Sequence, residues 1–270
     1  NSIIREKIKK FGDLLKEESG RTPGLAVVLV GENPASQVYV RNKIEKTKEV
    51  GFKSIEHKLD ENVTEEKLLS VVNELNNDEN VQGILVQLPL PKHINADLVL
   101  DTIKPVKDVD GFHAENVGKL WSGLNSLVPC TPLGCSILLK KLNPDLSGKN
   151  AIIIGRSNIV GKPVSILCQS ENATVTMCHS RTKDLNHKLS DADVVIVAVG
   201  VPKFISGDQI PEGAVVIDVG IHNIDGKLCG DVDFDSAKEK ASAITPVPGG
   251  VGPMTVCALI ENTIIAAERI

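Results

Sequence analysis

Short apolar runs that end near glycine or proline recur along the chain, and segments with helical spacing separate them. Strands are predicted over 25–30, 52–59, 83–88, 149–154, 173–178, 192–200 and 214–220. Most of these runs are apolar at every position, which is typical of parallel strands covered on both faces. Helices are predicted over 3–18, 36–50, 64–77, 97–103, 133–142 and 254–269. The alternation of the two kinds of segment indicates an α/β fold with parallel sheets.

Residues 149–163 form a strand, a glycine loop and a helix start, as in a nucleotide-binding βαβ unit. Gly155 and Gly161 would let backbone N–H groups approach a phosphate. Their spacing departs from G-x-G-x-x-G, so the loop alone fits an ordinary strand-to-helix turn equally well. Where an NAD enzyme would carry an acid, this chain has Ser180 and Arg181. Together with Arg156 they suit the 2′-phosphate of NADP.

Three predicted strands end at Gly155, Gly200 and Gly220. Ligands of open α/β sheets bind beyond the carboxyl ends of the strands, so we expect these glycines to line one crevice. The loop 246–253, rich in proline and glycine, fits the wall of a binding site and an interdomain hinge equally well.

Length and composition narrow the class of protein. The 270 residues suffice for one or two domains, of which we expect two, and 41% of them are hydrophobic. A net charge of −5 argues against sequence-independent binding of nucleic acid. We identify no apolar run near the length of a membrane span and no signal segment. The six cysteines form no C-x-x-C pair, which favours reduced, buried thiols and a cytoplasmic protein, or a mitochondrial one after removal of a transit peptide.

Two groups of polar residues could carry chemistry. Ser36, Tyr39 and Lys43 share one face of a helix that begins at the carboxyl end of strand 25–30. The alternative is a surface lysine beside a half-buried tyrosine. Gln87 is the one polar side chain in the apolar run 84–88 and needs a partner, which loop backbone could also supply.

Asp108 and Asp110 flank Val109 in a loop that ends in glycine. Their spacing could hold a hard cation but lacks further oxygen ligands, so we expect no metal site. Asp110 could accept hydrogen bonds from paired N–H donors of a ligand, or make an Asx turn. The sequence contains neither the H-E-x-x-H motif of zinc hydrolases nor the G-x-S-x-G motif of serine hydrolases.

Several motifs in order resemble the methylenetetrahydrofolate dehydrogenase/methenyltetrahydrofolate cyclohydrolase family. They are residues 30–36 with 39–43, 86–91, 107–111, 129–132, 155–157 and 246–255, which span nearly the whole chain. The resemblance implies NADP-dependent oxidation of 5,10-methylenetetrahydrofolate, hydrolysis of the methenyl product to 10-formyltetrahydrofolate, and a place in one-carbon metabolism and purine biosynthesis. It also implies a folate-binding domain over 1–127 completed by helix 254–270, a Rossmann-like NADP-binding domain over 128–253, and a homodimer.

The same resemblance implies roles for single residues. Lys43 would be the catalytic lysine, Gln87 would support it, Tyr39 would stack on the pterin and Asp110 would bind the pterin ring. Further folate contacts would come from Ser36, Val86, Leu88, Pro248, Gly249, Gly250, Val251 and Gly252. NADP contacts would come from Gly155, Arg156, Ser157, Ser180, Arg181 and the backbone around Ile221. Hydride transfer requires mainly alignment, whereas hydration requires a base, for which a lysine amine is suited.

Four alternatives remain open at the level of sequence. Some mitochondrial relatives prefer NAD and resemble the 33–36 region, although Ser180 and Arg181 favour NADP. Larger relatives append a formyltetrahydrofolate synthetase domain, so the chain could be one part of such an enzyme. An NADP-dependent shikimate-type dehydrogenase or a non-catalytic dinucleotide sensor would share the general plan, but the 39–43 string with Gln87 and Asp110 argues against the former.

Overall fold

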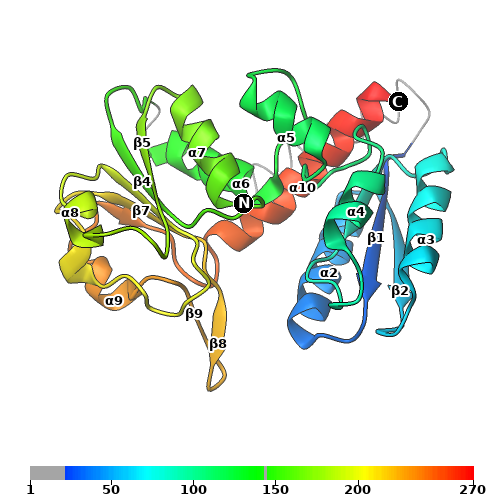
Figure 1. The fold of residues 1–270 in the computed structure, drawn as a ribbon, viewed down its shortest axis with the longest axis horizontal. Helices are drawn as coiled ribbons and strands as arrows, with labels where there is room; N and C mark the ends of the chain where they lie inside the picture. Colours follow the sequence, from blue (N-terminus) through cyan, green and yellow to red (C-terminus); the bar gives the residue numbers. More distant parts are fainter. Residues whose placement is uncertain (1–21, 143–144) are drawn as a thin grey trace. The chain divides into compact units, whose positions relative to one another are not determined.

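The computed structural model describes residues 22–142 and 145–270, so the helix predicted over 3–18 lies outside the described residues. The chain divides into two compact units. Unit 1 comprises the chain up to Cys130 together with Val256–Ile270, and unit 2 comprises Thr131–Thr255. Both contain parallel sheets with helices between the strands, which confirms the predicted α/β class (Figure 1).

Unit 1 is built on a three-stranded parallel sheet in the order β2-β1-β3. Its strands are β1 (Gly24–Val30), β2 (Lys53–Leu59) and β3 (Gly83–Val86). All seven residues of the central strand β1 are buried, as expected for a strand that is apolar on both faces. The helices are α2 (Pro34–Glu49), α3 (Glu65–Asn77), α4 (Ala96–Thr102), α5 (Ala114–Trp121) and the larger part of α10 (Val251–Arg269).

Local sequence determines where the first helices of unit 1 begin. The Asn33 side chain accepts a hydrogen bond from the Ser36 backbone N–H (3.1 Å) and caps α2, with Pro34 in the first turn. Thr64 caps α3 through the Lys67 N–H (3.2 Å). Leu68 and Val72 of α3 are fully buried in one cluster with residues of β1 and β3. This packing fixes the carboxyl ends of β1 and β3, where the candidate side chains lie.

Unit 2 is built on a five-stranded parallel sheet in the order β10-β7-β6-β4-β5. The strands are β4 (Asn150–Ile154), β5 (Thr174–Cys178), β6 (Val194–Val197), β7 (Val215–Asp218) and β10 (Ala243–Ile244). Alternate residues of these strands enter two separate apolar clusters, one on each face: Ile153 and Ile196 in the first, Ile152 and Val195 in the second. The helices are α6 (Cys130–Leu142), α7 (Gly161–Ser170), α8 (Leu185–Leu189), α9 (Phe234–Ala237) and the 3-10 turn Gly207–Gln209.

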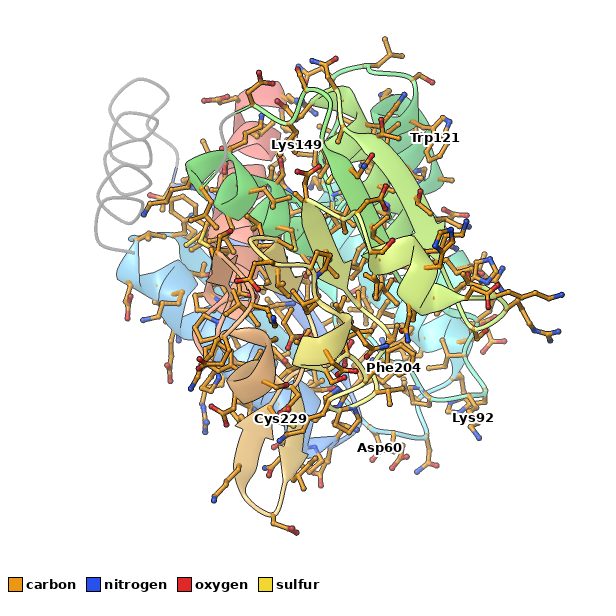
Figure 2. The ribbon with its side chains drawn as sticks, turned by 90° about the vertical axis from the view of Figure 1, so that its left-hand side faces the viewer. Asp60, Lys92, Trp121, Lys149, Phe204 and Cys229 are labelled. Atoms are coloured by element: carbon orange, nitrogen blue, oxygen red, sulfur yellow. The ribbon has the colours of Figure 1, made fainter. Side chains whose placement is uncertain are left out.

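Several elements were not predicted, among them a helix of unit 1 and a hairpin of unit 2. Helix α5 follows the loop that contains Asp110, and it ends at Trp121, whose side chain is 62% exposed (Figure 2). Strands β8 (His222–Ile224) and β9 (Lys227–Cys229) form an antiparallel hairpin. Asp225 and Gly226 join these strands with φ values of 51° and 81°, a conformation that the Asp-Gly dipeptide favours.

Helix α10 corrects two expectations. It begins at Val251 rather than Met254, so Val251 and Gly252 belong to its first turn and not to a loop. Among the described residues it is also the one helix long and apolar enough to span a membrane, against the expectation that no such run exists. Half of its most apolar stretch is buried inside the protein. The buried amide of Asn262 donates to the carbonyl oxygens of Val109 and Val128, both at 2.8 Å, as in a core helix of unit 1.

Candidate active site

Lys43 and Gln87 meet at the carboxyl edge of the unit 1 sheet. Lys43 projects from α2 and is only 7% exposed, and its Nζ donates a hydrogen bond to Gln87 Oε1 (3.1 Å). Gln87 follows β3 directly, and its backbone N–H donates to the Val28 carbonyl (2.9 Å), one step beyond the β1–β3 ladder. The structure thus brings together two residues 44 positions apart that the sequence proposed as a pair.

The alternatives raised for these residues are only partly right. Lys43 is buried, so the surface-lysine interpretation is wrong, whereas Tyr39 is half-buried as that interpretation held. Burial raises the pKa of Tyr39, so its hydroxyl stays protonated at neutral pH. Loop backbone does supply one partner of the Gln87 amide, since Nε2 donates to the Leu88 carbonyl (2.7 Å), but the amide oxygen accepts from Lys43. Ser36 is also buried.

The two aspartates differ in environment. Asp108 is 1% exposed, and its Oδ2 accepts hydrogen bonds from the His113 N–H (2.8 Å) and Asn116 Nδ2 (2.9 Å). Burial is the main reason that its pKa is raised. Asp108 therefore fixes the loop, whereas the carboxylate of Asp110 is partly exposed; its contact with a ligand stays a prediction. No group of three or more possible metal-ligating side chains occurs in the described part of the chain.

Cys130 and Asn262 hold the backbone beside Asp110, and sequence reasoning missed both. The Cys130 thiol and Asn262 Nδ2 both donate to the Val109 carbonyl, at 3.1 and 2.8 Å. Burial, followed by the charge of Asp110, raises the pKa of Cys130, while the charge of Lys43 acts in the opposite direction. The buried thiol therefore lies within the electrostatic reach of both candidate side chains. A polar residue inside the apolar last helix was the signal that could have identified Asn262.

In unit 2 the glycine loop after β4 forms a cradle lined by backbone. Gly155 has φ of +129°, and a Cβ there would lie 2.2 Å from the Ala198 carbonyl oxygen. A Cβ on Gly161 would lie equally close to the carbonyl oxygen of Gly155. Ser157 Oγ accepts hydrogen bonds from the N–H groups of Val160 (3.1 Å) and Gly161 (3.3 Å) at the start of α7. Only glycine fits this path, which permits close approach of a phosphate.

The predicted cofactor residues follow neighbouring strands. Ile154 of β4 pairs with Cys178 of β5, so Arg156 and Ser180 each stand two residues past the ends of adjacent strands. Arg156, Ser180 and the neighbouring Arg181 are exposed. Exposed basic side chains at this edge can reach an anionic group of a bound nucleotide.

The glycines at the other strand ends complete this edge. Gly200 and Gly220 follow β6 and β7; β6 pairs with β4 and β7 pairs with β6, so the three strand-ending glycines lie at one edge of the sheet. That they line one crevice stays a prediction. Ile221 comes next and is 43% exposed.

The remaining predicted folate residues are split between the units. Val86 ends β3 and is buried, and Leu88 is partly buried, both in unit 1. Residues 248–252 belong to unit 2, where the Gly250 N–H donates to the Pro246 carbonyl (2.9 Å) at the start of α10. Their contact with a folate stays a prediction.

A glycine cradle at the carboxyl edge of a parallel sheet, with a second α/β unit that buries a lysine, defines a two-domain enzyme with an NAD(P)-binding domain. Comparison with known families narrows this class. The profile described as tetrahydrofolate dehydrogenase/cyclohydrolase, catalytic domain, matches residues 1–110, and the corresponding NAD(P)-binding domain matches residues 129–270. The chain belongs to the tetrahydrofolate dehydrogenase/cyclohydrolase family, as its motifs indicated.

Individual relatives are similar to this protein in sequence or structure over nearly the whole chain. Bifunctional protein FolD of Listeria innocua serovar 6a is 57% identical over 99% of this chain and 94% of its own length. The crystal structure of the bifunctional FolD enzyme from Campylobacter jejuni superposes with a TM-score of 0.96 at 50% identity, covering 99% of this chain and 95% of that one. The Trypanosoma brucei enzyme, solved with NADP and an inhibitor, has a TM-score of 0.95 at 40% identity and covers 99% and 94%.

The same comparison argues against the shikimate-type alternative. Shikimate dehydrogenase of Aquifex aeolicus reaches a TM-score of 0.55 at 16% identity, which shows a shared fold alone. Both family profiles and the relatives at high identity support instead a bifunctional dehydrogenase and cyclohydrolase.

Proposed function

We propose that this chain oxidises 5,10-methylenetetrahydrofolate with NADP and hydrolyses the methenyl product to 10-formyltetrahydrofolate, with Lys43 serving both steps. The observation that carries the proposal is the hydrogen bond from the buried Lys43 Nζ to the partly buried Gln87 Oε1 in a chain of this family. The Gln87 amide oxygen accepts from the lysine without adding a negative charge, which suits a lysine that must also exchange a proton.

The side chains of unit 1 would bind the folate and transfer the proton. Tyr39, on the same helix as Lys43, would stack its ring on the pterin, and Asp110 would accept two N–H bonds from the pterin ring. Lys43 as an ammonium would orient the folate during oxidation, and as an amine it would take a proton from the attacking water. Gln87 would hold the lysine in one position for both steps.

The side chains of unit 2 would hold the cofactor, which accepts the hydride when bound. The glycine cradle at Gly155 leaves backbone space for the pyrophosphate. Arg156 and Arg181 would pair with the 2′-phosphate, and the Ser180 hydroxyl would donate to it. This set of donors offers no carboxylate acceptor to the ribose hydroxyls of NAD, so we propose a preference for NADP.

The direct test supplies methylenetetrahydrofolate and NADP to the purified chain and follows NADPH absorbance, then supplies methenyltetrahydrofolate alone and follows its decay. Both signals are expected above the uncatalysed rates. A chain that binds NADP but forms no NADPH would be a dinucleotide sensor. NAD, with or without phosphate and magnesium, should give a lower kcat/KM than NADP.

We further propose that the chain works as a homodimer in the cytoplasm, without nucleic-acid or membrane partners. Apolar side chains of unit 2 that remain exposed, including Phe204 in Figure 2 and Ile224 and Leu228 of the hairpin, support an association surface. Light scattering of the purified chain should give twice the mass of one chain, and a monomer at micromolar concentration would contradict this.

A further inference from the structure

A buried carboxylate joins the loops that follow two neighbouring strands of unit 2. Asp231 is 0% exposed, and its Oδ2 accepts hydrogen bonds from the backbone N–H groups of Val199 (2.7 Å) and Gly200 (2.9 Å), just beyond β6. Its Oδ1 lies 2.7 Å from Nε2 of His222, which follows the loop after β7. One side chain therefore fixes two segments of the sheet edge at which we place the cofactor.

Two neighbouring residues, Gly220 and Asp218, make room for Asp231 and hold it in place. A Cβ on Gly220 would lie 2.3 Å from Asp231 Oδ1, so only glycine fits there. Asp218, also buried, holds the backbone of Asp231, because its Oδ1 accepts the Asp231 N–H (2.9 Å). Burying a charge is costly unless it is fully hydrogen-bonded, and an apolar side chain would fill the same space without that cost. The carboxylate therefore serves a purpose other than packing.

The contacts of Asp231 are of a kind that orients backbone. Charge-assisted bonds to two consecutive N–H groups fix the direction of the peptide planes at Val199 and Gly200. The contact with His222 fixes the segment that presents Ile221, whose backbone we place against the cofactor. Without the carboxylate, the N–H groups of Val199 and Gly200 would lose this charged partner and the two loops would be free to separate.

We propose that Asp231 is a positioning residue for NADP, which sets the shape of the crevice beyond β6 and β7 without touching the cofactor. The inference rests on the proposed function, since it assumes that the nucleotide binds at this edge. It predicts a defect confined to cofactor binding. Hydrolysis of methenyltetrahydrofolate requires no NADP and takes its proposed base, Lys43, from unit 1, so it provides an internal control for folding.

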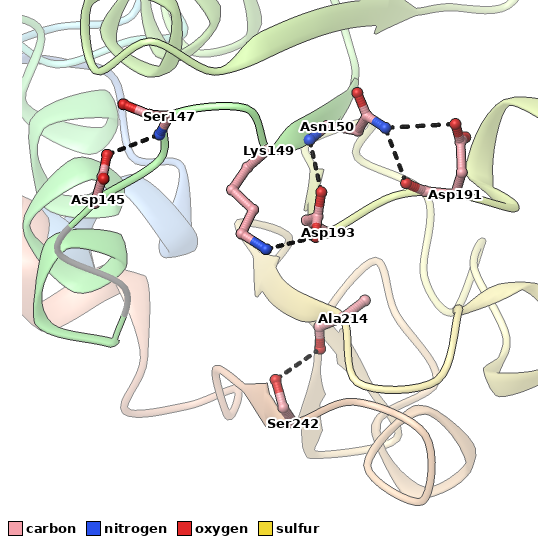
Figure 3. A network of polar contacts seen from close by, with 8 residues as sticks. All are labelled: Asp145, Ser147, Lys149, Asn150, Asp191, Asp193, Ala214 and Ser242. Atoms are coloured by element: carbon pink, nitrogen blue, oxygen red, sulfur yellow. Dashed lines mark hydrogen bonds and ion pairs between the residues drawn. The ribbon is translucent and has the colours of Figure 1, made fainter.

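The test compares two substitutions at Asp231 with one at a carboxylate that accepts from backbone at the opposite edge of the same sheet. Asp231→Leu removes every contact, whereas Asp231→Asn can still accept from Val199 and Gly200 and present its amide to His222. The control is Asp193→Leu. Asp193 accepts from the Asn150 N–H (2.8 Å) and Lys149 Nζ (3.0 Å) at the amino end of β4, the opposite edge of the same sheet (Figure 3).

Calorimetric titration with NADP, in the absence of folate, measures the affinity directly. Asp231→Leu should raise the Kd for NADP about tenfold or more, which is the scale of one lost charge-assisted hydrogen bond, and Asp231→Asn should restore most of the affinity. Asp193→Leu should leave the Kd unchanged. In kinetics, Asp231→Leu should raise KM for NADP more than it lowers kcat, with the cyclohydrolase rate unchanged.

An Asp231→Leu protein that binds NADP as the wild type does would overturn the inference, as would an equal loss of cyclohydrolase activity and NADP affinity. If this variant does not fold, His222→Phe decides, because it removes only the contact to the segment after β7. An unchanged Kd in that variant overturns the inference, and a several-fold increase supports it. A wild-type chain that fails to bind NADP would instead refute the proposed function itself.

Discussion

Gln87→Glu replaces the neutral partner of Lys43 by a charged one of nearly the same shape. In the wild type the Gln87 oxygen accepts from Lys43 Nζ at 3.1 Å, and its amide nitrogen donates to the Leu88 carbonyl at 2.7 Å. A carboxylate cannot donate to Leu88, so repulsion from that carbonyl drives it toward the lysine. The substitution therefore creates an ion pair at a site where Lys43 is 7% exposed.

The size of the effect follows from the distance and the burial. An opposite charge within about 4–6 Å stabilises the charged form of a group by about 1.4–4 kcal/mol. At a fixed pH where most of the lysine is still protonated, the fraction present as a neutral amine then falls about 10- to 1000-fold. If the amine is the base of hydration, the cyclohydrolase rate at neutral pH falls by the same factor, while oxidation, which needs alignment and the ammonium, falls less.

The assay is the decay of methenyltetrahydrofolate absorbance over a series of pH values, corrected for uncatalysed hydrolysis. The rate of Gln87→Glu should recover as pH rises, because the ammonium then loses its proton. Gln87→Leu is the control, since it removes the acceptor without adding charge, and its profile should move toward lower pH. Identical pH profiles for Gln87→Glu and the wild type would refute the role of Lys43 as a base governed by residue 87.

Three further outcomes are expected. Asp110→Asn should weaken folate binding about tenfold or more and leave NADP binding unchanged, because the amide nitrogen is a donor and cannot accept the second of two paired N–H bonds; equal losses in separate titrations would indicate an Asx turn instead. Replacing Arg156 and Arg181 together by Ala should raise KM for NADP far more than KM for NAD, and a parallel rise would contradict pairing with the 2′-phosphate. Lys107→Met should lower the free energy of unfolding by about 1–3 kcal/mol in urea titrations, since the buried ammonium donates to two carbonyls at the end of α3 (3.2 and 2.8 Å); wild-type stability would refute this.

Much of the fold was predictable because its signals are local. The uniformly apolar runs around Val28, Ile153 and Ile196 could only be central strands of covered parallel sheets, and they are. The helix predicted over 64–77 begins at the residue whose side chain caps it, Thr64, whereas α2 begins at Pro34, two residues before its predicted start. The β8–β9 hairpin was missed although its Asp225-Gly226 turn is a local signal, since its strands are only three residues long.

The site was predictable where residue type and strand position coincided, as for Lys43 and Gln87. What could not be predicted depends on contacts across long sequence separations. Asn262 reaches the loop of Asp110 from 153 residues away, and no period in the sequence encodes that contact. Asp231 likewise was not among the candidate residues, and only the fold reveals that it holds the loops after β6 and β7.

The central claim is that Lys43 serves both reactions, and Lys43→Met tests it most directly. The exposed Lys48 of the same helix supplies the control substitution, Lys48→Met. For each protein, shown by circular dichroism to be folded, the decay of methenyltetrahydrofolate is measured beside NADPH formation from methylenetetrahydrofolate. We predict that Lys43→Met lowers the cyclohydrolase rate to the uncatalysed background and retains a fraction of the dehydrogenase rate, while Lys48→Met keeps both. A wild-type rate of methenyltetrahydrofolate decay in Lys43→Met would contradict the claim.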